Sequence, residues 1–138
     1  MEPTELLPIV SLLSLITVEF GGFALLRVLA GRMTIAEPER REFAFRFFRA
    51  GHAHAGVLIV LSLAYFLYLE RTDYSSGMQW LAGIVLVAGT LAQSGGFFVH
   101  SSVGEYDRWS IGNTMSVIGA VLIAVALVIL AIGLISAL

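Results

Sequence analysis

The sequence predicts an all-α, polytopic membrane protein, a four-transmembrane-helix bundle with almost nothing outside the bilayer. Three observations favour this class. Of the 138 residues, 58% are hydrophobic and only 13% are charged, which is less polar surface than a soluble domain of this size requires. The charges are also grouped, and long apolar stretches lie between the groups. Each stretch is long enough, at about 1.5 Å of rise per residue, to cross a hydrocarbon core of about 30 Å.

The four predicted spans make up most of the chain and form a single transmembrane domain. They cover about residues 6–28, 50–69, 78–102 and 110–136. Because each crossing takes about 20 residues, no separate soluble domain fits into the remainder. The last two connections are short, so we expect consecutive spans to be antiparallel neighbours.

The distribution of basic residues predicts the orientation. All eight are arginines, and six of them lie between the first two spans. A cytoplasmic location for this connection places seven arginines inside and one outside, as the positive-inside rule requires. The prediction is therefore a multi-pass protein of the cytoplasmic (inner) membrane with both termini outside. The eight residues are Arg27, Arg32, Arg40, Arg41, Arg46, Arg49, Arg71 and Arg108.

The first connection predicts a short amphipathic interfacial helix over about residues 37–49, before the second span. Thr34, Glu37 and Pro38 resemble a helix start, with a hydroxyl, an acid three residues later and then a proline. Phe43 and Phe47 recur at four-residue spacing and form an apolar side. Either this side lies on the membrane, or the phenylalanines cover the end of the bundle. The interfacial arginines are Arg40, Arg41, Arg46 and Arg49.

Small residues predict where the helices touch. Gly112, Ser116, Ala120 and Ala124 recur every four residues in the fourth span. Such a stripe lets two helix backbones approach closely and replaces the hydrophobic drive that lipid cannot supply. We therefore expect this stripe to pack against a neighbouring span.

Six polar residues inside the predicted spans do not suit a surface that faces lipid. An ionisable side chain costs about 2.5 kcal/mol or more at the centre of a bilayer, so such groups normally face the interior and find partners. Counting residues from the nearest charges places all but one of the six in the cytoplasmic half. We therefore expect a buried Glu/His cluster there. The six are Glu19, His52, His54, Gln93, His100 and Asn113, and Gln93 is the one nearer the midplane.

The histidines of the second span cannot both join this cluster. His52 and His54 point about 200° apart on a regular helix. At most one of them can therefore join Glu19 and His100, and the sequence leaves open which one.

Three interpretations of the cluster remain open. In the first, the cluster is a hydrogen-bonded network that fixes the register of the helices. Alternatively, it is a metal or haem site, in which His52 or His54 pairs with His100 on a b-type haem, or these residues bind a divalent metal together with Glu19. The third interpretation is acid–base work on a proton or a small lipophilic substrate.

Other classes are excluded by what the sequence lacks. It contains no phosphate-binding loop, dinucleotide fingerprint or nucleophile elbow. With no cysteine, it has neither disulfides nor thiolate ligands. The net charge of −2 does not favour nucleic acid as a partner. The lipid bilayer is the expected environment, and a chain this small is expected to form a homo-oligomer or to join a larger membrane complex.

One segment carries a resemblance. Residues 47–58, Phe-Phe-Arg-Ala-Gly-His-Ala-His-Ala-Gly-Val-Leu, open the second span. This segment resembles one found in uncharacterised small four-helix bacterial membrane proteins, and it is more distantly similar to the second span of hydroxylaminobenzene mutase-like proteins. The resemblance implies a short four-span architecture, and a small membrane enzyme or isomerase with the histidine segment in its site.

Two functional hypotheses follow. In the first, the chain is an accessory or assembly subunit of a membrane complex, and its polar cluster is structural. In the second, it is a small membrane enzyme or a haem- or metal-binding protein that uses Glu19, His54 and His100 on a lipophilic substrate or cofactor. The sequence leaves open whether it is an enzyme.

Overall fold

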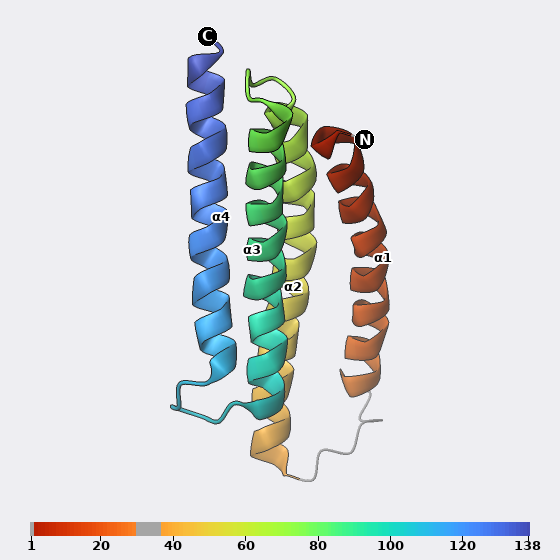
Figure 1. The fold of residues 1–138 in the computed structure, drawn as a ribbon. Helices are drawn as coiled ribbons and strands as arrows, with labels where there is room; N and C mark the ends of the chain where they lie inside the picture. The colour runs from red at the N-terminus through yellow and green to blue at the C-terminus, as the bar shows by residue number, and fades with distance from the viewer. Residues whose placement is uncertain (1, 30–36) are drawn as a thin grey trace.

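The computed structural model describes residues 2–29 and 37–138, and in these ranges it is all-helical, as predicted (Figure 1). Each helix is long and apolar enough to cross a membrane. The helices lie within a few residues of the predicted spans, except at the start of the second. They are α1 (Pro3–Leu29), α2 (Pro38–Leu69), α3 (Ser76–Val103) and α4 (Ile111–Ser136).

Consecutive helices run antiparallel, so both termini lie at one end of the bundle (Figure 1). The end of α1, the start of α2 and the α3–α4 connection lie at the opposite end. Helix α3 packs against both α2 and α4, whereas α1 packs mainly against α2. Among the described residues α1 makes no contact with α4. The bundle is therefore a compact group of α2, α3 and α4 with α1 along one side.

The prediction of a separate interfacial helix over residues 37–49 is wrong. Helix α2 begins at Pro38, with Glu37 as its N-cap, and continues without a break for 32 residues. No proline interrupts it, and Gly51 is held inside the helix by close packing, since a Cβ there would lie 3.1 Å from Phe97 Cβ. Thr34 and Arg32 lie outside the described residues.

The closest helix packing joins α3 and α4. A Cβ on Gly96 would lie 2.5 Å from the carbonyl oxygen of Gly112, and one on Gly119 would lie 2.2 Å from the backbone nitrogen of Gln93. Ser116 Oγ adds a hydrogen bond of 3.2 Å to the carbonyl oxygen of Gln93. Glycine is therefore needed for the two backbones to approach this closely.

The buried face of α4 follows alternating steps of three and four residues, the spacing of left-handed helix packing. The predicted four-residue stripe is right at Gly112, which is buried, and at the half-buried Ser116, but Ala120 and Ala124 are exposed. A strict four-residue step rotates about 40° per step around the helix, so the stripe leaves the interface. The buried residues are Gly112, Gly119, Ile123, Ala126, Leu130 and Gly133.

The apolar core lies toward the end that holds the termini. Tyr65 is buried there, and its hydroxyl donates to the carbonyl oxygen of Ala126 at 3.0 Å. Leu7 of α1 reaches this core over Gly83, where a Cβ would lie 2.3 Å from Leu7 Cδ1. Ser76 Oγ donates to the Glu2 carboxylate at 2.7 Å. These contacts fix the first turns of α1 against α3.

Candidate functional site

The six polar residues predicted to converge lie in separate places. His100 and Asn113 belong to one network at the end of the bundle opposite the termini. His52 faces α1, and His54 faces α3. Glu19 lies on the outer side of α1. Gln93 sits in the α3–α4 contact, where its backbone carbonyl accepts from Ser116. The structure therefore gives no common Glu/His cluster.

The network at the bundle end centres on His100, which is only 4% exposed. Its Nδ1 lies 2.7 Å from Ser110 Oγ. Ser110 in turn donates its hydroxyl hydrogen to Asn113 Oδ1 at 3.1 Å, and the same oxygen accepts the backbone N–H of Ser110 at 2.9 Å. The Ser110 hydroxyl therefore lies between the imidazole and the Asn113 side-chain oxygen, and its single hydrogen can go to only one of them. His100 thus links the end of α3 to the capping box of α4.

Two phenylalanines from the start of α2 enclose the His100 ring. The Phe47 ring stands perpendicular to it with centroids 4.2 Å apart, and the Phe43 centroid lies 5.1 Å away. Phe43 is 2% exposed. Of the two alternatives for this segment, the second is therefore found: the phenylalanines cover the end of the bundle.

Arg40 caps the end of α3. Its guanidinium donates to the carbonyl oxygen of Gly104 at 2.8 Å, to that of Ser101 at 3.1 Å and to that of Ser102. These carbonyls belong to the last turn of α3 and the residue after it, where a cation also complements the helix dipole. Arg46 instead forms a 3.6 Å ion pair with Glu42 on an exposed surface. Together, the contacts of His100, the phenylalanines and Arg40 order three helix ends: the start of α2, the end of α3 and the start of α4.

The two histidines of α2 point toward different helices, as their spacing predicts. His52 fills the space beside the glycine pair of α1, because a Cβ on Gly21 would lie 3.3 Å from its Nδ1. His54 Nδ1 lies 2.8 Å from the carbonyl oxygen of Ala50, and its ring packs at 4.7 Å on Phe97. Among the described residues, no hydrogen bond or ion pair joins either histidine to Glu19 or His100.

Glu19 faces outward, although we expected it inside. It is exposed in the middle of α1, on the same face as Ile16, Phe20 and Phe23, whose side chains are 52%, 69% and 63% exposed. Within the described ranges it makes no hydrogen bond or ion pair. This is an ionisable group on an otherwise apolar helix face.

The described part of the chain contains no group of three or more histidine, aspartate or glutamate side chains that could hold a metal ion. The dispersal of Glu19, His52, His54 and His100 explains this finding. A haem or divalent metal therefore stays a prediction that these contacts do not favour.

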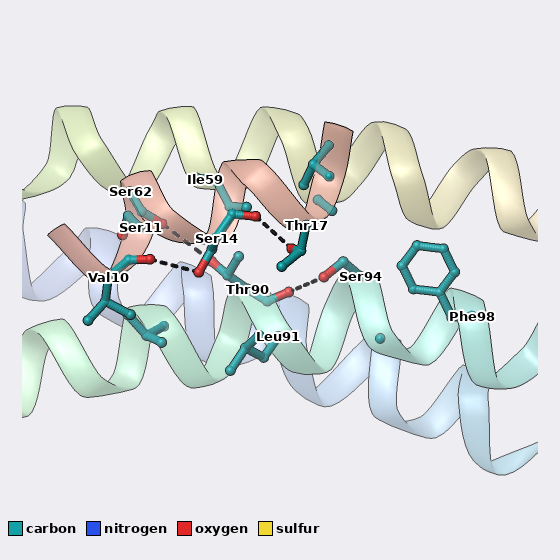
Figure 2. A pocket seen from close by; sticks show the side chains of 14 residues that line it. Val10, Ser11, Ser14, Thr17, Ile59, Ser62, Thr90, Leu91, Ser94 and Phe98 are labelled. Carbon is teal, nitrogen blue, oxygen red and sulfur yellow. Dashed lines mark hydrogen bonds between the residues drawn. The ribbon is translucent and has the colours of Figure 1, made fainter. Parts of the chain in front are cut away.

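The structure contains a pocket that the sequence reasoning missed. Its volume is about 390 Å³, and it lies between α1, α2 and α3 (Figure 2). Six valine, leucine, isoleucine and phenylalanine side chains form the apolar part of the wall. Six hydroxyl side chains also line it: Ser11, Ser14 and Thr17 of α1, Ser62 of α2, and Thr90 and Ser94 of α3.

Five of the six hydroxyl hydrogens of this pocket are already used within their own helices. Ser14 donates to the carbonyl oxygen of Val10 at 2.7 Å, Ser62 to that of Leu58 at 2.8 Å and Ser94 to that of Thr90 at 2.6 Å. Ser11 and Thr17 likewise donate within α1. Thr90 Oγ1 lies 3.5 Å from Ser62 Oγ. Since each hydroxyl has one hydrogen and two lone pairs, the lining offers acceptors.

Two contacts of α1 flank the pocket. Toward the start of α1, Leu7 packs over Gly83; toward its end, Gly21 and Gly22 pack on His52. Between these points small side chains face one another and leave space. A signal for this was present in the sequence, because Ser11, Ser14 and Thr17 recur every three residues along one side of the first span. Serine and threonine commonly bond to their own helix, and their pattern therefore predicts a site only once the facing helices are known.

Comparison with protein-family models, with curated proteins and with solved structures finds no match to this chain. The resemblance of residues 47–58 therefore stays a prediction.

Proposed function

We propose that the chain crosses the cytoplasmic membrane four times, with both termini outside, and acts as a non-catalytic assembly subunit of a membrane complex. Four helices of sufficient length and apolarity support the crossing. The described arginines at the start of α2 and in the α3–α4 connection lie at the end opposite the termini, which supports the orientation.

The observation that carries the proposal is the exposed carboxyl group of Glu19. Glu19 lies about 12 Å deeper in the membrane than Arg27, at about 1.5 Å of rise per residue along α1. A charged side chain at the centre of a transmembrane helix costs about 2.5–3.5 kcal/mol, so such groups pair with others or face the interior. Glu19 has no partner among the described residues, and we infer that the outer face of α1 takes one from another chain.

The packing of α1 supports the same conclusion. In its most apolar 18-residue window 11% of residues are buried, against 28–39% for the other helices. A helix held this lightly within its own chain still has a large face for a neighbour. Association in lipid depends on packing and on interhelical hydrogen bonds, and Glu19 supplies a site for the latter.

The partner is a transmembrane helix of a different protein with an arginine, lysine or hydrogen-bond donor opposite Glu19. A second copy of this chain is less suitable. A two-fold interface presents the same patch from both subunits, and would bring two Glu19 carboxyl groups together, which disfavours the ionised form of both.

The size of the complex in native membranes tests this proposal. The tagged full chain is extracted in a mild detergent and compared with Glu19→Leu, Glu19→Gln and the control Glu70→Leu, since Glu70 is exposed at the end of α2. We expect Glu19→Leu to release the chain from the complex, Glu19→Gln to weaken the complex and Glu70→Leu to leave it intact. A complex unchanged in Glu19→Leu would contradict the proposal, as would the same size formed by the purified chain alone.

A further inference from the structure

The hydroxyl-lined pocket between α1, α2 and α3 is a candidate ligand site that the assembly role does not use. Its volume of about 390 Å³ falls in the range of small-molecule sites. We propose that it binds a lipid-soluble phenol: an aromatic ring with an apolar tail and one hydroxyl that donates a hydrogen bond to the wall.

The polar part of the wall selects a donor. Four of the hydroxyl side chains are more than nine-tenths buried, with exposures of 6% for Ser11, 2% for Ser62, 6% for Thr90 and 6% for Ser94. Since Ser11, Ser62 and Ser94 give their hydrogens to helix carbonyls, their oxygens remain as acceptors. A ligand that only accepts, such as an ether or a ketone, finds at most the hydroxyl hydrogen of Thr90, whose Oγ1 lies 3.5 Å from Ser62 Oγ.

The apolar part of the wall selects an aromatic ring. Phe98 closes one end of the pocket, one helical turn beyond Ser94 on the same face of α3 (Figure 2). A phenol whose hydroxyl reaches Ser94 Oγ therefore places its ring beside Phe98, where an offset or edge-to-face contact is favourable. A saturated alcohol lacks this second interaction.

The position of the opening selects a ligand that comes from the membrane. Val10 and Thr17 of α1 and Leu91 of α3 line the pocket and are exposed. The rim therefore faces sideways between α1 and α3, where a bilayer presents hydrocarbon. The lining contains no charged side chain, so the ligand is neutral.

Binding of para-hexylphenol to the full chain in nanodiscs tests this inference. The matched ligand is para-hexylanisole, in which a methyl group replaces the phenolic hydrogen, and both are expressed as mole fractions in the lipid to correct for partitioning. We expect the phenol to bind about tenfold more tightly, because only it donates to the wall. Equal affinities would overturn the donor assignment.

Two substitutions locate the site. Gly95 lines the pocket, and a Cβ there meets nothing within 4 Å, so Gly95→Leu fills the space without a backbone clash. Gly77 of the same helix is also unobstructed but lies outside the pocket, and Gly77→Leu is the matched control. We expect Gly95→Leu to weaken phenol binding at least about tenfold and Gly77→Leu to leave it unchanged.

A third substitution tests the hydrogen bond itself. Ser94→Ala removes an acceptor, so it should weaken the phenol about fivefold and leave the anisole unchanged. Phenol binding retained in Gly95→Leu, or weakened equally in Gly77→Leu, would show that the probe binds elsewhere and would overturn the site. Because none of these variants touches Glu19, the outcome is independent of the assembly proposal.

Discussion

His100 Nδ1 and Ser110 Oγ lie 2.7 Å apart and join the last turn of α3 to the N-cap of α4. The same serine accepts the backbone N–H of Gly112 and donates to Asn113. One hydroxyl thus serves both as a helix cap and as the partner of a buried imidazole. The α3–α4 connection is therefore ordered by polar contacts as well as by the close packing of the two helices.

The double role of Ser110 predicts a larger loss of stability than a helix cap alone gives. Ser110→Ala should lower the free energy of unfolding by about 2–4 kcal/mol, about 1 from the cap and the rest from the buried imidazole left without its hydrogen-bond partner. Ser75→Ala is the control, because Ser75 caps α3 by accepting from Met78 N–H. It should cost about 1 kcal/mol. Unfolding of the two variants in mixed micelles measures the difference, and equal losses would refute the double role.

Arg40 should matter far more than its neighbour Arg46. Arg40→Ala removes a cation that bonds three carbonyls at the end of α3 and should destabilise the protein by about 2 kcal/mol. Arg40→Lys should restore only part of the lost stability, since an ammonium lacks the planar set of N–H donors of a guanidinium. Arg46→Ala breaks an exposed ion pair and should change stability by less than about 0.5 kcal/mol. Thermal unfolding in detergent measures all three, and a full rescue by lysine would argue against the multi-carbonyl cap.

Adjacent glycines of α3 should respond in opposite directions to alanine. At Gly96 a Cβ would lie 2.5 Å from the Gly112 carbonyl oxygen, so Gly96→Ala should push α3 and α4 apart and cost about 1–3 kcal/mol. At Gly95 a Cβ meets nothing within 4 Å, and Gly95→Ala should stabilise the helix by about 0.5–1 kcal/mol. Denaturant unfolding gives both values. Destabilisation by Gly95→Ala, or tolerance of Gly96→Ala, would contradict the packing described here.

The fold could be predicted from the sequence because apolar length is a local property. Four long apolar stretches with charges between them led to four helices at nearly the right positions. The error at residues 37–49 arose because an amphipathic pattern fits two environments equally well. Phe43 and Phe47 suit a lipid surface or a buried ring such as His100, and only the register between α2 and α3 decides between them.

The candidate site was much less predictable, because it depends on the rotation of each helix. Nearly uniform apolarity leaves that rotation undetermined, so depth alone could not show whether Glu19 and His100 face each other. The separation of His52 from His54 could be predicted, since it is a property of one helix. The pocket could not be predicted, because the hydroxyls that line it come from three helices and each has an ordinary explanation within its own helix.

Site-specific photo-crosslinking from the outer face of α1 in native membranes is the most direct test of a partner helix at Glu19. A photoreactive residue is placed at Phe20, which is 69% exposed beside Glu19, and as a control at Val121 of α4, which is 57% exposed. We expect a protein adduct from position 20 only, mapped to a partner's transmembrane segment with a basic or hydrogen-bond-donating residue, and lost in Glu19→Leu. Adducts with lipid alone from position 20, or a protein adduct that persists without the Glu19 carboxyl group, would contradict it.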